Sequence, residues 1–207
     1  MYFRSIPVSP LETNCYLLGD EAAGLCCLVD PGGDSDKILD LVRQSGLTLN
    51  AILLTHGHWD HCTAVPDILE AFPGIPVYIH EKEVLSSGRG NPRYFFPPTG
   101  DVRTVDEGDT IQAGGLTFHV LRTPGHTAGS LVYLSGDAML AGDTLFAGTC
   151  GRCDLPGGSL EDMMHSLRRL AELEGDYAVY PGHGGFSSLP EERRFNPYMV
   201  QALRQNR

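Results

Sequence analysis

The sequence predicts a mixed α/β fold in one domain. Three observations support this prediction: short β-prone apolar runs alternate with amphipathic segments, 42% of the 207 residues are hydrophobic, and no polar or low-complexity stretch is long enough to separate two domains. A chain of this length and composition can bury a substantial core. We therefore expect a single domain over residues 1–207.

The first half combines strands with helices. Apolar, β-prone runs bounded by Pro, Gly and Asp predict strands at 2–8, 13–18, 24–29, 51–55 and 77–80. Apolar residues at helical spacing predict helices over 35–45, which Gly46 ends, and over 61–72. Residues 86–101 are rich in Gly and Pro, and we expect an irregular loop there.

The second half repeats this mixture. Strands are expected at 116–122, 131–134, 138–141 and 177–180. Ser159 and Asp162 resemble a capping box and predict the start of a helix over 159–173. Its apolar stripe predicts one buried face, made of Leu160, Met163, Met164, Leu167 and Leu170. Asn196-Pro197 predicts the start of a last short helix.

The charge balance excludes several classes of partner. With 15 basic and 26 acidic residues the formal charge is −11, so the chain lacks the electrostatic footprint of a nucleic-acid binder and would be repelled by anionic lipid. No apolar run approaches 18 residues, and no secretion signal precedes Pro10. Six cysteines are too few for a disulfide scaffold of this length. We expect a cytoplasmic protein with reduced thiols.

The segment Thr55-His56-Gly57-His58-Trp59-Asp60-His61 concentrates metal-binding side chains. His56 and His58 would point to opposite faces of an extended strand, so both can reach one ion only if the chain turns after Thr55. Gly57 permits such a turn. Asp60 and His61 then begin a helix and can address an adjacent position. A chance cluster of histidines is a poor explanation, since the segment directly follows a buried strand.

Three further residues share this strand-to-turn context. His126 follows Thr123-Pro124-Gly125, Asp143 follows Ala141-Gly142, and His183 follows Pro181-Gly182. Imidazole and carboxylate together suit Zn²⁺ and also Fe or Mn. The ligands of the first segment either crowd around one ion or divide between two ions that share a bridging group. The later residues favour the second arrangement.

The motif His-x-His-x-Asp-His followed by His, Asp and His resembles the metallo-β-lactamase superfamily, and most closely its glyoxalase II-like branch, the hydroxyacylglutathione hydrolases. The resemblance runs from Asp30-Pro31-Gly32-Gly33 to Asn196-Pro197. It implies a four-layer αββα sandwich with the site at one edge of two sheets. By the same resemblance, a first metal is held by His56, His58 and His126, a second by Asp60, His61 and His183, with Asp143 bridging them and Asp30 supporting the site from behind.

This resemblance implies metal-assisted hydrolysis of a small thioester. Two divalent ions, Zn most readily, offset by Asp60, Asp143 and one hydroxide, would leave a local charge of about +1. Bound metal lowers the pKa of water to about 7, which gives a hydroxide nucleophile at neutral pH, and it stabilises the oxyanion that forms. Asp60 could also orient the hydroxide or handle a proton. An S-acylglutathione such as S-lactoylglutathione is the first expected substrate.

The substrate contacts depart from the glyoxalase II pattern. Cys62-Thr63-Ala64 stands where a Gly-Gly pair is usual, and Cys150-Gly151-Arg152 replaces Cys-Gly-Lys. Arg152 could clamp a carboxylate or form an ordinary surface salt bridge. Cys150 and Tyr94 are further candidate contacts. The chain ends 24 residues after His183, so the C-terminal glutathione-binding helices of long glyoxalase II enzymes are expected to be absent.

Rival interpretations stay open at this point. A persulfide dioxygenase-like enzyme would use one iron, held by His56, His58 or His126, and Asp143. A metal-binding scaffold without turnover would need the same ligands, and Cys150 with Cys153 could form a redox dithiol. The natural acyl group, the metal in the cell and the oligomeric state are not set by these patterns.

Overall fold

The computed structural model describes residues 1–87 and 100–204. Its first six-stranded sheet has the order β1-β2-β3-β4-β5-β6, antiparallel from β1 to β3 and parallel from β3 to β6. The strands are β1 (Tyr2–Val8), β2 (Thr13–Asp20), β3 (Leu25–Val29), β4 (Thr48–Leu53), β5 (Pro76–Ile79) and β6 (Asp101–Thr104).

The second sheet has the order β14-β13-β10-β9-β8-β7. Its strands are β7 (Thr110–Ala113), β8 (Leu116–Arg122), β9 (Leu131–Ser135), β10 (Ala138–Gly142), β13 (Ala178–Pro181) and β14 (Ser187–Ser188). Only the β10–β13 pair is parallel among these pairs. A small hairpin of β11 (Leu145–Phe146) and β12 (Thr149–Cys150) follows β10.

Alternating side chains make the two sheets into the middle of a four-layer sandwich. In β2, Cys15 and Leu17 pack outward, whereas Tyr16 and Leu18 pack inward against Phe118 of β8 and other residues of the second sheet. Successive side chains of a strand point to opposite faces, so an apolar run of this kind supplies two cores at once. Both sheets are therefore buried on both faces over much of their length.

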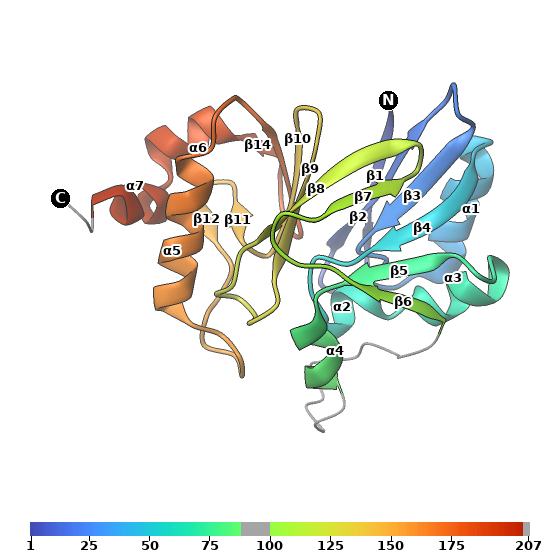
Figure 1. Cartoon of the computed structure of the whole chain (residues 1–207), viewed down its shortest axis with the longest axis horizontal. Coiled ribbons are helices and arrows are strands. Elements are labelled where there is room, and N and C mark those ends of the chain that lie inside the picture. The colour runs from blue at the N-terminus through green and yellow to red at the C-terminus, as the bar shows by residue number, and fades with distance from the viewer. Residues whose placement is uncertain (88–99, 205–207) are drawn as a thin grey trace.

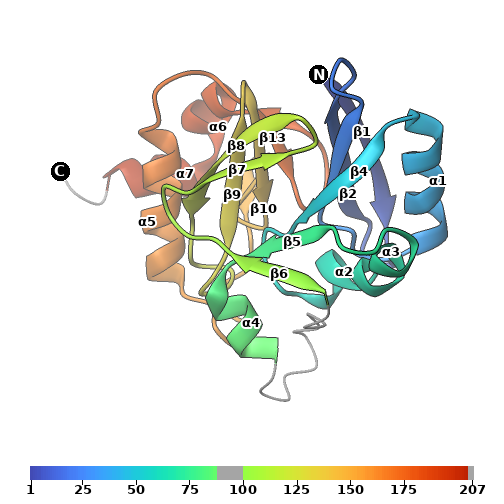
Figure 2. The same ribbon diagram turned by 45° about the vertical axis from the view of Figure 1, so that its right-hand side comes forward.

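Helices form the two outer layers. On the first sheet lie α1 (Ser35–Ser45), α2 (Trp59–Cys62) and α3 (Val65–Ala71), and on the second lie α5 (Leu160–Ala171), α6 (Leu189–Phe195) and α7 (Pro197–Arg204), as Figures 1 and 2 show. The short α4 (Glu81–Ser87) follows β5. The expected four-layer αββα arrangement is thus confirmed. No helix in the described ranges is long and apolar enough to cross a membrane.

Several expected elements need correction. The helix predicted over 61–72 is two helices, because Pro66 lacks the N–H that would continue the hydrogen-bond ladder across Thr63 and Ala64. The loop predicted over 86–101 is wrong at both ends, because α4 extends to Ser87 and β6 begins at Asp101; residues 88–99 lie outside the described part. The sequence does not predict the helices α4 and α6 or the strands β6, β7, β11, β12 and β14.

The predicted face of α5 is also partly wrong. Ser159 caps the helix as expected, accepting a hydrogen bond from the Asp162 N–H, and Met163 and Leu167 are fully buried. Leu160, however, is 59% exposed. It is the first residue of α5 and lines an open groove between α5 and α7.

Candidate metal centre

The predicted ligands lie on segments that follow four strand ends. His56 and His58 follow β4, His126 follows β8, Asp143 follows β10, and His183 follows β13. β10 and β13 are parallel, and β8 runs in the same direction because β9 is antiparallel to both of its neighbours, β8 and β10. The carboxyl ends of these strands therefore meet at one edge of the second sheet, where the end of β4 joins them from the first.

Three imidazoles form the first group. His56 Nε2 lies 3.1 Å from His58 Nδ1, which lies 2.9 Å from His126 Nε2. All three side chains are buried, with at most 5% of each residue exposed. The chain does turn after Thr55 as predicted, so both histidines of the His-x-His motif face one point. This group could hold one metal ion.

The second group combines a carboxylate with two imidazoles. His61 Nε2 lies 3.3 Å from His183 Nε2, and Asp60 Oδ2 lies 3.3 Å from the same His183 nitrogen and 3.6 Å from His61 Nε2. Asp60 and His61 come from α2, which begins directly after His58. His58 of the first group therefore lies directly before α2, and Asp60 and His61 of the second group lie in its first turn.

Asp143 reaches both groups. Its Oδ2 lies 3.4 Å from His126 Nε2 in the first group, and its Oδ1 lies 3.4 Å from His61 Nε2 in the second. The side chain is buried, and its Oδ2 also lies 3.7 Å from His183 Nε2, so the carboxylate lies between the two groups. A bridging carboxylate would occupy such a position.

Hydrogen bonds on the outer ring nitrogens orient three of the imidazoles. His126 Nδ1–H donates to Arg152 O at 2.8 Å, and His183 Nδ1–H donates to Leu11 O at 3.1 Å. His61 Nδ1–H donates to Asp30 Oδ2 at 2.9 Å. Each of these rings therefore turns Nε2 toward the centre, as metal-ligating histidines do when the other nitrogen is bound to an acceptor.

Asp30 organises the ring of a fourth histidine through Thr55. The Thr55 hydroxyl donates to Asp30 Oδ2 at 2.6 Å, so its oxygen is left to accept from His56 Nδ1–H at 3.1 Å. Asp30 Oδ1 also accepts from the Thr55 backbone N–H. The Asp30 backbone has a φ of 52°, an unusual conformation for a non-glycine residue. The predicted supporting role of Asp30 thus has a direct geometric basis.

The pKa shifts match a cation site. Burial and the neighbouring His61 hold the pKa of His56 well below its ordinary value, and burial lowers that of His58 to about 3. Burial would raise the pKa of Asp143, but His61 outweighs it and lowers that pKa. For His61, burial lowers the pKa while Asp143 and Asp30 raise it well above its ordinary value. At neutral pH His56 and His58 are therefore uncharged, and the second group holds a proton that a metal would displace.

The donor set fits two divalent ions. His56 and His126 turn lone pairs toward His58 Nδ1, so the first group gathers three ring nitrogens around at most one shared proton. Buried lone pairs facing each other without a donor are unfavourable, and a cation resolves that conflict. The mixed nitrogen and oxygen ligands suit Zn, Fe or Mn.

Gly182 lets the second group close. A Cβ at this position would lie 2.2 Å from Asp143 Oδ1 and 2.7 Å from the His61 ring. Any side chain there would push the bridging carboxylate away from His61. The glycine that precedes His183 is therefore required by close packing of the ligands.

A cleft of about 460 Å³ opens onto these ligands. Besides the ligands, its walls are made of Leu11, Trp59, Phe146, Thr149, Cys150, Arg152 and Leu155. The sequence did not single out Leu11, Trp59 or Phe146, because an apolar residue in a turn carries no signal of the site it will face. Their arrangement gives the cleft apolar walls beside a polar floor.

The predicted substrate contacts have different outcomes. Cys150 lies on the cleft wall and is half-buried. Arg152 lies at the rim, but its guanidinium is bound by both carboxylate oxygens of Asp154, each at 2.7 Å. Tyr94 lies outside the described residues. Cys150 and Cys153 are free thiols.

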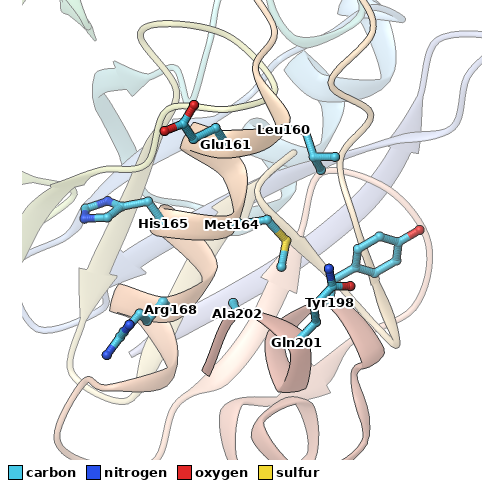
Figure 3. A pocket seen from close by; sticks show the side chains of 8 residues that line it. All are labelled: Leu160, Glu161, Met164, His165, Arg168, Tyr198, Gln201 and Ala202. Carbon is cyan, nitrogen blue, oxygen red and sulfur yellow. The ribbon is translucent and has the colours of Figure 1, made fainter. Parts of the chain in front are cut away.

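A larger groove lies elsewhere. It lies between α5 and α7 and has a volume of about 630 Å³. Figure 3 shows Leu160 and Met164 of α5 on the side of Tyr198 and Ala202 of α7. Within the described ranges, every group of side chains able to hold a metal ion has at least one member that lines the smaller cleft. The smaller cleft is therefore the candidate site, because it contains the metal-binding side chains.

Comparison with known proteins agrees with this geometry. The family model of the Metallo-beta-lactamase superfamily matches residues 8–183. Hydroxyacylglutathione hydrolase GloC of Haemophilus influenzae is 31% identical over 96% of this chain and 98% of its own length. The probable metallo-hydrolase YqgX of Bacillus subtilis is 36% identical over the same shares. The probable polyketide biosynthesis zinc-dependent hydrolase BaeB of Bacillus velezensis is 34% identical over 86% of this chain and 76% of its own.

Solved structures point the same way. The B3 metallo-beta-lactamase BLEG-1 superposes with a TM-score of 0.85 and 33% identity, covering 96% of this chain and all of its own. ETHE1 from Myxococcus xanthus gives 0.82 and 32%, covering 100% and 92%. TTHA1623 in a di-iron-bound form gives 0.81 and 35%, covering 94% and 99%.

Replacing Asp30 by Asn should weaken metal binding at the second group. Asp30 accepts hydrogen bonds from three donors: the Thr55 N–H, the Thr55 hydroxyl and His61 Nδ1–H. An Asn side chain has one acceptor oxygen, and its NH₂ group would face at least one of these donors. Loss of such a supporting hydrogen bond typically costs about ten- to a hundredfold in metal affinity. Titration with a competing chelator measures the loss, and Asp36→Asn, an exposed carboxylate on α1, is the control. Unchanged metal retention in Asp30→Asn would contradict the role given to Asp30.

Proposed function

The chain belongs to the metallo-β-lactamase superfamily, and we propose that it is a dinuclear metal hydrolase that cleaves a small thioester such as an S-acylglutathione. The observation that supports this most directly is the position of Asp143, within 3.4 Å of a ligand nitrogen in each of the two groups. The likeness to a relative named hydroxyacylglutathione hydrolase supports the thioester. We propose zinc as the first choice of metal, since another relative is named zinc-dependent, with iron as the rival suggested by the di-iron structure.

The proposed chemistry divides between the metal and the protein. When bound, two divalent ions would supply a nucleophile from water at neutral pH and would polarise the carbonyl under attack. Asp143, which lies between the two groups, would contribute ligand oxygens and negative charge to both. Asp60, whose Oδ2 accepts a hydrogen bond from the Thr13 hydroxyl at 3.1 Å, lies at the cleft floor and can orient or receive a proton there.

The walls of the cleft suit a small acyl group. Trp59, Phe146 and Leu11 line one side of the cleft and would exclude water once a substrate is bound, which would strengthen electrostatic interactions at the floor. Arg152 is an arginine that lines the cleft, and its guanidinium can bind a carboxylate on the thiol half of the substrate. We propose that the partner is a small molecule of this kind, and that neither nucleic acid nor a membrane surface is bound.

A persulfide dioxygenase activity is the second candidate, because the superposed ETHE1 structure is 32% identical to this chain. That activity would use one iron. Asp60, His61 and His183 lie close enough to form a complete second group, and this supports the two-metal hydrolase instead. The two candidates predict different products from different substrates.

The purified protein should hydrolyse S-lactoylglutathione, lose activity when metal is removed by a chelator, and regain it when Zn²⁺ is restored. Asp143→Ala should abolish turnover because both metal positions lose a ligand. Thiol release and metal content per chain are measured together. One iron per chain with O₂ uptake on glutathione persulfide, and no thioester hydrolysis, would refute the proposal in favour of the dioxygenase.

Arg152 provides a test of substrate recognition. Arg152→Ala should raise KM for S-lactoylglutathione with little change in kcat, because the contact is to a part of the substrate that does not react. Asp154→Asn, which releases the guanidinium from its bidentate partner, should lower KM. Steady-state kinetics of both variants decide the matter. If both match the unmodified protein, Arg152 forms only a surface salt bridge.

A further inference from the structure

Glu83 is a buried carboxylate that the proposed chemistry does not use. It lies on α4, which follows β5 (Figure 2), and none of its surface is exposed. Burial of a carboxylate is unfavourable unless hydrogen bonds compensate for the lost water. The partners of Glu83 therefore indicate what the burial achieves.

Each carboxylate oxygen of Glu83 accepts a hydrogen bond from a different loop. Oε2 accepts from the Gly57 N–H at 2.9 Å, and Oε1 accepts from the Gly129 N–H at 2.8 Å. Gly57 lies between His56 and His58, and Gly129 lies three residues after His126. One side chain thus joins the two segments that carry the first group of imidazoles.

The packing around the carboxylate leaves it little room to move. A Cβ on Gly129 would lie 2.6 Å from Glu83 Oε1, so the carboxylate rests directly on the backbone of that loop. The sheets behind the loops are joined independently, since Leu131 N–H donates to Thr55 O at 2.8 Å and the Tyr133 hydroxyl donates to Leu54 O at 2.8 Å. Loss of Glu83 should therefore loosen the loops and leave the sandwich intact.

We propose that Glu83 is a positioning residue for the first metal group, which holds the loop of His56 and His58 against the loop of His126 so that the three ring nitrogens converge. It acts through backbone N–H groups and touches neither metal nor substrate. Its role parallels that of Asp30, which serves His61 and, through Thr55, His56. The inference rests on the two-position metal centre of the proposed function.

The test measures each metal position separately. His183→Ala disables the second group and leaves the first, and His126→Ala does the reverse. Glu83→Gln is then added to each background, and Co²⁺ affinity and the visible Co²⁺ spectrum are recorded. Gln keeps the shape but turns an NH₂ group toward one of the two backbone donors. The first position should lose about ten- to a hundredfold in Co²⁺ affinity, and the second should change little.

Two further variants complete the design. Glu81→Gln, an exposed neighbour on α4, should leave both positions unchanged. Gly129→Ala displaces the same carboxylate from the other side, so it should reproduce the selective loss and carries the test if Glu83→Gln does not fold. Equal weakening at both positions, or none at either, would overturn the role of Glu83 while the metal centre stands. If neither His183→Ala nor His126→Ala binds Co²⁺, the two-position centre fails, and the inference fails with it.

Discussion

The site depends on ring nitrogens and carboxylate oxygens that are forced together away from water. In the first group three buried imidazole nitrogens lie about as far apart as hydrogen-bond partners, at 2.9 and 3.1 Å, with too few protons to pair them. In the second group His61 is driven toward its protonated form by Asp143 and Asp30. Both conflicts are relieved by a cation, so the fold holds ligands in a geometry whose natural complement is a metal ion.

The sandwich makes this convergence possible. A buried strand anchors the start of each ligand segment, and the ligands are placed where these strands end at one edge of the sandwich. Polar groups behind the ligands then fix the rings of His56, His61, His126 and His183. Asp30, Thr55, Glu83 and backbone carbonyls of Leu11 and Arg152 occupy the outer nitrogens or the loop N–H groups. The metal group is thus the inner part of a larger hydrogen-bonded network.

Much of this arrangement could be predicted from the sequence. One short segment contains His56, His58, Asp60 and His61. An apolar run and a glycine precede each of the later ligands, His126, Asp143 and His183. The sequence therefore predicts that all of these side chains lie at the ends of strands. Glu83 could not be found this way, because a glutamate on a short helix normally faces water and only tertiary packing buries it. Leu160 is an error of the opposite kind. Helical spacing places it on the apolar face of α5, but no neighbouring element covers it and it stays exposed.

Two metal ions should lie on either side of Asp143. Anomalous diffraction from crystals of protein purified without added metal tests this most directly. We expect two peaks per chain, about 3.5–4 Å apart as in other two-metal sites, one among His56, His58 and His126 and the other among Asp60, His61 and His183. A single peak on His56, His58, His126 and Asp143, with His183 turned away, would contradict it.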